Sequence, residues 1–248
     1  MDSSHRLVLF AHGRSGSSSL SKILQSHPKL NILFEPFNKD FTSWHPDAPN
    51  YLELITDIPS LEEQLESIFQ SYNGVKVLDY QLSESLYVHM LQRPDLKVLF
   101  LYRRNLLQSV VSSMLAEHSS IWHKWDMEHP IQGYYQRLAP LSISDIREQI
   151  GWLQEYRTLY GQIIAALPED KRLILVYEDV YLGTPEERAS WLGRIWQFLN
   201  LDPIDSSAVQ QYLDPHVAKM NSYETYQLIP NIDEINQQLG NDITGWLC

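Results

Sequence analysis

A short segment near the amino terminus, Gly13–Ser18, combines small residues, hydroxyl groups and one arginine (GRSGSS). It follows an apolar run and precedes a helical pattern, so it presents several backbone N–H groups at the positive end of a helix dipole. Gly16 allows an anion to approach the backbone closely, Ser17 and Ser18 offer hydroxyl donors, and Arg14 adds a fixed positive charge. These groups predict a phosphate-binding loop, because a simple helix cap needs one serine and does not need Arg14.

The loop departs from the Walker A pattern of kinases and NTPases. In that pattern a lysine precedes the final serine or threonine, and no lysine precedes Ser17 or Ser18. The nearest candidates for a Mg²⁺-binding aspartate at a strand end are Asp79 and Asp179. A nucleotide kinase or NTPase therefore stays as an alternative interpretation.

The elements that must position this loop alternate along the chain. Apolar runs predict strands at 6–11, 30–34, 75–78, 97–102 and 172–177. Helical spacing predicts helices at 18–26, 60–72, 82–91, 106–118, 142–167 and 184–199, with shorter ones at 206–213 and 232–239. Ser60 and Glu63 have the spacing of a capping box, and 35–59 is expected to be mostly loop. Uniformly apolar strands alternating with helices predict a P-loop-like, three-layer α/β domain with a parallel sheet of about five strands covered on both faces.

Composition limits the class of protein. The chain has 248 residues, a net charge of −12 and a single cysteine, Cys248. One cysteine excludes an internal disulfide, and an acidic chain disfavours general nucleic-acid binding. The start of the chain predicts no signal peptide, and no apolar run reaches the roughly 18–20 residues of a membrane span. We therefore expect a cytoplasmic protein, with residues 1–248 forming one domain.

Two motifs in sequence order are similar to the donor-binding start of sulfotransferases. Gly13–Leu20 (GRSGSSSL) is followed by Leu33–Phe37 (LFEPF). In carbohydrate-type and bacterial sulfotransferases, an R-S-G-S-S loop precedes a strand that ends in L-x-E-P. The resemblance implies 3′-phosphoadenosine 5′-phosphosulfate (PAPS) as co-substrate, with its 5′-phosphosulfate in the loop. Weaker matches at 72–81, 176–180 and 198–201 extend the resemblance over about residues 7–201.

The resemblance also implies a receptor for the 3′-phosphate of the nucleotide. The family pattern places an arginine at a strand end and a serine eight residues later, a spacing that Arg104 and Ser112 have. That spacing puts the serine about two helical turns along the next helix. Arg103 with Ser109 is the alternative pair.

Sulfuryl transfer demands in-line positioning and stabilisation of developing charge, so no metal is expected. The resemblance implies Glu35, just past the second strand, as the general base for the acceptor hydroxyl. Together with Arg14, Lys76 is expected to neutralise charge near the transferring group. Three other side chains remain alternative bases: Asp79, His118 and His123.

The acceptor side is less defined. Residues 119–140 are expected to form an acceptor-site insertion whose rings suit a carbohydrate or another small hydroxylated molecule, and equally a packed flap or a dimer contact. The rings in question are Trp122, Trp125, Tyr134 and Tyr135. The tail 203–248 lacks the K-G-x-x-G loop of cytosolic sulfotransferases, and Lys219 and Asn221 are its candidates for a lid over the nucleotide. A catalytically inactive nucleotide-binding module is the third interpretation, and the sequence does not choose an oligomeric state.

Overall fold

The computed structural model describes residues 6–122, 138–214 and 223–247. Its centre is one parallel sheet in the order β2-β3-β1-β4-β5. The strands are β1 (Leu7–Ala11), β2 (Ile32–Phe34), β3 (Gly74–Leu78), β4 (Lys97–Tyr102) and β5 (Arg172–Val176). The predicted α/β class with about five parallel strands is confirmed, and each predicted strand agrees to within two residues at either end.

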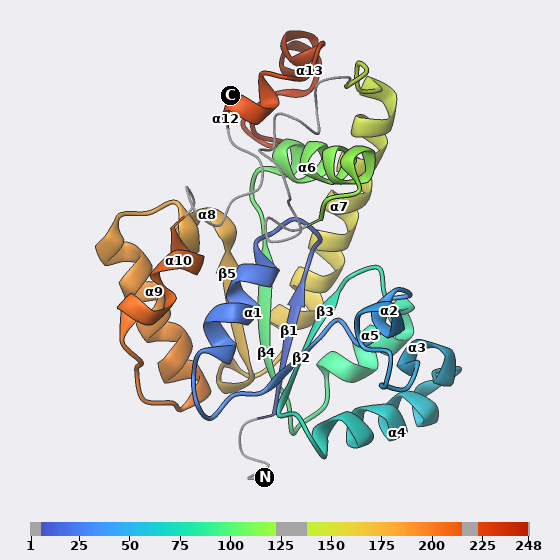
Figure 1. The fold of residues 1–248 in the computed structure, drawn as a ribbon, viewed down its shortest axis with the longest axis vertical. Helices are drawn as coiled ribbons and strands as arrows, with labels where there is room; N and C mark the ends of the chain where they lie inside the picture. Colours follow the sequence, from blue (N-terminus) through green and yellow to red (C-terminus); the bar gives the residue numbers. More distant parts are fainter. Residues whose placement is uncertain (1–5, 123–137, 215–222, 248) are drawn as a thin grey trace.

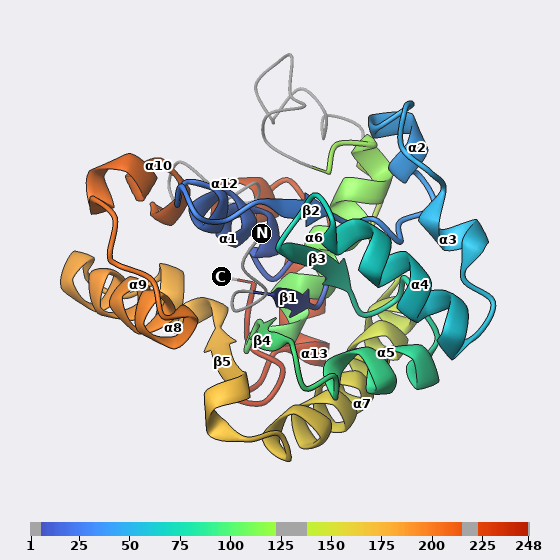
Figure 2. The same ribbon diagram turned by 90° about the horizontal axis from the view of Figure 1, so that it is seen from below.

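Helices cover both faces of the sheet, as Figures 1 and 2 show from two directions. One face packs against α1 (Ser17–Gln25), α8 (Tyr177–Tyr181), α9 (Pro185–Leu199), the 3₁₀ segment Ser206–Val209 and α10 (Gln210–Leu213). The other packs against α2 (Phe41–Trp44), α3 (Tyr51–Leu54), α4 (Ile58–Phe69), α5 (Glu84–Leu91) and the second half of α7 (Ile143–Ala165). A short 3₁₀ turn, Glu169–Lys171, leads into β5.

A third cluster lies beyond the carboxyl ends of the strands, at the top of Figure 1. It joins the first half of α7 to α6 (Leu106–Ser119), α12 (Tyr223–Tyr226) and α13 (Ile232–Leu239). The described parts of the tail therefore separate: 206–213 packs beside α1, and 223–247 packs beside α6.

The burial of β1 explains why its sequence is apolar without alternation. All five of its residues are fully buried. Leu7 and Leu9 pack on the α1 face, whereas Val8 and Phe10 pack on the α5 face. Burying each such side chain contributes about 1.5–3 kcal/mol, so both faces of this strand stabilise the domain.

Two local predictions need correction, the start of one helix and its cap. The helix expected at 60–72 begins at Ile58, because Asp57 is its N-cap and accepts a hydrogen bond from the Ser60 amide at 2.9 Å. The expected capping box of Ser60 and Glu63 is therefore wrong; Pro59 fits the first turn, where its missing N–H costs nothing. The segment 35–59 is mostly loop, as expected, and contains the single-turn helices α2 and α3. The last strand ends at Val176, and α8 begins at Tyr177.

In the described residues, no helix is both long and apolar enough to cross a bilayer.

At the edge of the sheet where the strands begin, ion pairs between charged side chains connect neighbouring elements. The Asp95 carboxylate accepts hydrogen bonds from Arg93 at 2.9 and 3.0 Å and from Arg6 at 2.9 Å. Burial acts to raise the pKa of Asp95, but these hydrogen bonds outweigh it and lower the pKa to about 2.

Because the folded-state pKa of Asp95 lies below the unfolded value of about 3.9, its contribution to stability is present above that value and is lost as the pH falls towards about 2. Asp95→Asn should therefore lower the free energy of unfolding at neutral pH, and the difference from wild type should shrink below about pH 4. Urea titrations at a series of pH values measure this difference. Asp202→Asn is the control, since the Asp202 side chain is 97% exposed. A difference that stays constant down to about pH 2 would contradict the assignment.

Candidate active site

The loop between β1 and α1 has the backbone geometry that anion binding requires. Arg14 and Gly16 both adopt left-handed conformations, with φ of 62° and 87°. Gly16 is the N-cap residue of α1, and as a glycine it has no side chain that could cap the helix. The buried Ser15 hydroxyl donates to the His12 carbonyl at 2.6 Å and so closes the loop on itself. The first amides of α1 are thereby left available at the positive end of the helix dipole.

Two tyrosines of α8, Tyr177 and Tyr181, pack against this loop. The Tyr181 hydroxyl donates to the Gly16 carbonyl at 3.0 Å. A Cβ atom at Gly16 would lie 2.9 Å from the Tyr177 ring and 3.0 Å from the Tyr181 ring. Glycine is thus required here both by the positive φ and by the close approach of the rings.

Arg14 links the loop to α6. Its Nε donates to the Ser112 hydroxyl at 3.1 Å, and its terminal nitrogen donates to the Trp122 carbonyl at 2.7 Å. Ser112 itself is buried. The structure thus brings together Arg14 of the predicted phosphate loop and Ser112 of the predicted 3′-phosphate pair.

Glu35 and Lys76 form a buried ion pair at the same edge of the sheet. Phe34 and Lys76 are partners in the β2–β3 register, so Glu35 follows directly beside the lysine, and its amide donates to the Lys76 carbonyl at 2.9 Å. The Lys76 Nζ contacts Glu35 Oε1 and lies 4.1 Å from the centre of the Phe34 ring. Burial lowers the pKa of Lys76 and the charge of Arg14 adds to that effect, whereas Glu35 opposes it.

The second oxygen of Glu35 is also held. Oε2 accepts hydrogen bonds from Gln81 at 2.8 Å and from Asn38 at 2.7 Å. An ionised carboxylate offers about four lone-pair positions, and within the part of the chain that the structure describes three donors occupy three of them. The sequence alone assigned no role to Gln81 or Asn38. Their positions could have indicated one, because Gln81 lies three residues beyond the end of β3 and Asn38 lies three residues beyond Glu35.

His12 and Asp79 form a second buried pair. They directly follow β1 and β3, whose last residues Ala11 and Leu78 are register partners. His12 Nδ1 lies 2.6 Å from Asp79 Oδ2, and both side chains are almost fully buried. Asp79, one of the alternative bases, is therefore paired with His12. The contact holds His12, the residue directly before the Gly13–Ser18 loop, in place. His118 lies exposed at the end of α6.

The two adjacent arginines after β4 differ in environment. Arg103 is buried and lies 4.6 Å from the centre of the Tyr177 ring. Arg104 is exposed, and its guanidinium pairs with Asp179 at 2.9 Å. This hydrogen bond raises the pKa of Arg104. Of the two residues predicted for the 3′-phosphate, Arg104 therefore faces Asp179 and Ser112 faces Arg14. In the alternative pair, the Ser109 hydroxyl donates to the Asn105 carbonyl at 3.3 Å.

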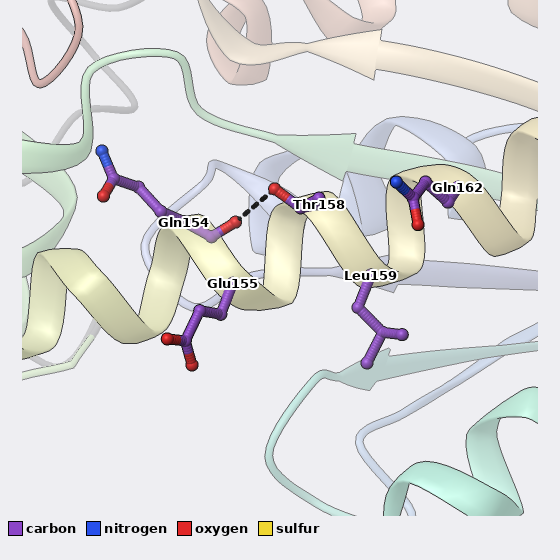
Figure 3. A pocket seen from close by; sticks show the side chains of 5 residues that line it. All are labelled: Gln154, Glu155, Thr158, Leu159 and Gln162. Atoms are coloured by element: carbon purple, nitrogen blue, oxygen red, sulfur yellow. Dashed lines mark hydrogen bonds between the residues drawn. The ribbon is translucent and has the colours of Figure 1, made fainter.

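Some predicted positions lie outside the described residues. These are Lys219, Asn221, His123, Trp125, Tyr134 and Tyr135. In the described ranges there is no group of three or more His, Cys, Asp or Glu side chains that could hold a metal ion. A surface hollow of about 410 Å³ runs along α7 (Figure 3). Only α7 side chains line it, so it is separate from the loop and from Glu35.

Comparison with known proteins gives structural matches only. No family model and no curated protein matches the sequence. Mouse sulfotransferase SULT7A1 complexed with PAP is 16% identical, with a TM-score of 0.43 over 90% of this chain and 66% of that chain. A sulfotransferase from Alicyclobacillus acidocaldarius is 14% identical, with a TM-score of 0.48 over 96% of this chain and 97% of that one. The sulfotransferase domain from the curacin biosynthetic pathway is 13% identical, with a TM-score of 0.47 over 96% and 93% of the two chains.

The requirement for glycine at position 16 can be measured. Gly16→Ala should lower the free energy of unfolding by about 1–3 kcal/mol, because a side chain there combines a left-handed backbone with a clash against two rings. The matched control is Gly193→Ala on α9, where an added Cβ meets nothing within 4 Å. That control should be neutral or stabilising by up to about 1 kcal/mol. Equal urea midpoints for the two variants would refute the argument.

Proposed function

We propose that this protein is a sulfotransferase that moves a sulfuryl group from PAPS to the hydroxyl of a small-molecule or carbohydrate acceptor. The observation that carries the proposal is the convergence of two features at one edge of the sheet. The start of α1, with Gly16 at its N-cap and Arg14 two residues before it, lies beside the buried Lys76–Glu35 pair. The charge of Arg14 acts on this pair, since it contributes to lowering the pKa of Lys76. One feature suits a bound anion, and the other suits proton removal beside a positive charge.

The residues present fit the donor nucleotide. The amides and hydroxyls of Gly13–Ser18, with Arg14, would hold its 5′-phosphosulfate, and Arg104 with Ser112 would hold its 3′-phosphate. Lys219 of the tail is proposed as a lid contact. When bound, PAPS supplies an activated sulfuryl group, and no metal takes part in this proposal.

The chain's own contribution is positioning and charge. Arg14 and Lys76 are fixed cations that would stabilise negative charge developing on the equatorial and leaving-group oxygens. Glu35 has one lone-pair position not used by its three donors. It can therefore accept the proton of the acceptor hydroxyl while Gln81 and Asn38 hold the carboxylate in one orientation.

Calorimetric titration with 3′-phosphoadenosine 5′-phosphate (PAP) tests the donor site, with 5′-AMP and ATP–Mg²⁺ as controls. We expect metal-independent binding of PAP that collapses when the 3′-phosphate is missing. Arg104→Ala should weaken PAP by about tenfold, since a hydrogen bond to a charged group is worth roughly 1.5–3 kcal/mol. Preference for ATP–Mg²⁺ would point to a kinase or NTPase instead, and unchanged PAP affinity in Arg104→Ala would remove this arginine from the site.

Glu35→Gln tests the base. It should reduce the transfer rate by about 10²–10⁴-fold, the usual contribution of a positioned general base, while leaving PAP affinity unchanged. The readout is release of PAP from PAPS with the first hydroxylated acceptor that supports turnover in a screen. Glu53→Gln, at an exposed position on α3, is the matched control. A fully active Glu35→Gln enzyme would end the assignment. PAP binding without turnover for any acceptor would favour an inactive nucleotide-binding module.

A further inference from the structure

Two adjacent acidic residues follow β5, Glu178 and Asp179, and they engage the β4–α6 turn in different ways. The Glu178 carboxylate accepts the backbone N–H groups of Arg104 at 2.8 Å and Asn105 at 3.0 Å, one on each oxygen. Its Oε1 also lies 3.9 Å from Arg103 Nε. Its side chain is only 17% exposed. Glu178 therefore fixes the backbone of the turn.

The turn is fixed from the helix side as well. Asn105 is the N-cap of α6, and its side-chain oxygen accepts the Gln108 amide at 2.8 Å. With both amides of the turn bound by Glu178 and the helix capped by Asn105, the backbone of Arg104 does not depend on what its guanidinium binds. The side chain can thus change partners while the turn stays in place.

Asp179, in contrast, pairs with the guanidinium of Arg104. Its Oδ1 lies 2.9 Å from a terminal nitrogen of Arg104, and the two side chains are 37% and 59% exposed. An ion pair this exposed is weak, typically about 0.2–1 kcal/mol. A phosphate group carries more charge than a carboxylate and matches the planar fork of arginine equally well. An anion that reaches Arg104 from solvent can therefore displace Asp179.

We propose that Asp179 is an internal competitor for the 3′-phosphate of the nucleotide: its carboxylate occupies Arg104 in the empty site and is exchanged for that phosphate. This inference rests on the proposed function and deepens it. As a consequence, Asp179 weakens binding of the 3′-phosphorylated nucleotide and narrows the difference in affinity between it and a 5′-nucleotide without the 3′-phosphate. A 5′-nucleotide without the 3′-phosphate has no group to exchange for Asp179, so Asp179 leaves its affinity unchanged.

The test is calorimetric titration of Asp179→Asn with PAP and with 5′-AMP at low ionic strength. Loss of the competing charge should tighten PAP by about two- to fivefold, the equivalent of an exposed ion pair, and leave 5′-AMP unchanged. In an Arg104→Gln background, Asp179→Asn should have no effect, because the exchange needs the guanidinium. Asp202→Asn, which removes one negative charge beside Lys29, is the matched control and should change neither ligand.

Three results would overturn the inference: weaker PAP binding in Asp179→Asn, unchanged PAP binding, or an equal gain for PAP and 5′-AMP. A gain that persists in the Arg104→Gln background would overturn it too. In each of these cases PAP still binds the wild-type protein, so the proposed function survives. Absence of PAP binding in the wild type would instead remove the proposed function together with this inference.

Discussion

The parallel register of β1 with its two neighbours is the constraint on which the rest of the structure depends. Ala11 lies beside Leu78 of β3 on one side and Leu101 of β4 on the other. The residues that follow these three strands therefore lie together at one edge of the sheet. At that edge lie the Gly13–Ser18 loop after β1, Asp79 and Gln81 after β3, and the two arginines after β4. A shift of one residue in either pairing would turn these side chains to the opposite face of the sheet.

A second constraint is the burial of Lys76 within β3. An ammonium group with almost no solvent contact must have an anionic partner, since an unpaired buried charge costs several kcal/mol. Glu35 supplies the charge, and the Phe34 ring covers the lysine from another side. The pair thereby joins the end of the edge strand β2 to the neighbouring strand β3. Asn38 and Gln81 then fix the carboxylate, so a group proposed for chemistry is also part of the packing.

The sequence predicted the strands well because each is an apolar run bounded by turn residues, a signal that survives without knowledge of tertiary contacts. It predicted the loop because Gly16 and Arg14 have few other reasons to occur together there. It failed where the outcome depends on partners distant in sequence. Whether Arg103 or Arg104 is buried depends on the Tyr177 ring and on Glu178. Asp57, not Ser60, caps this helix because Ile58 and Pro59, which lie between them, can join its first turn. The bonds of Gln81 and Asn38 to Glu35 require the fold itself.

The last turn of the described chain closes on the start of α6. The Trp246 carbonyl accepts hydrogen bonds from Asn105 at 2.8 Å and Gln108 at 2.9 Å, and the Leu107 amide donates to Thr244 at 2.9 Å. The Asn105–Trp246 contact joins residues 141 apart in the sequence. During synthesis on the ribosome, the sheet and the loop between β1 and α1 can therefore assemble before this contact exists. The turn that carries Arg104 acquires its contacts with the tail only when residues 244–246 have emerged, so the loop after β1 and this turn reach their final contacts at different times.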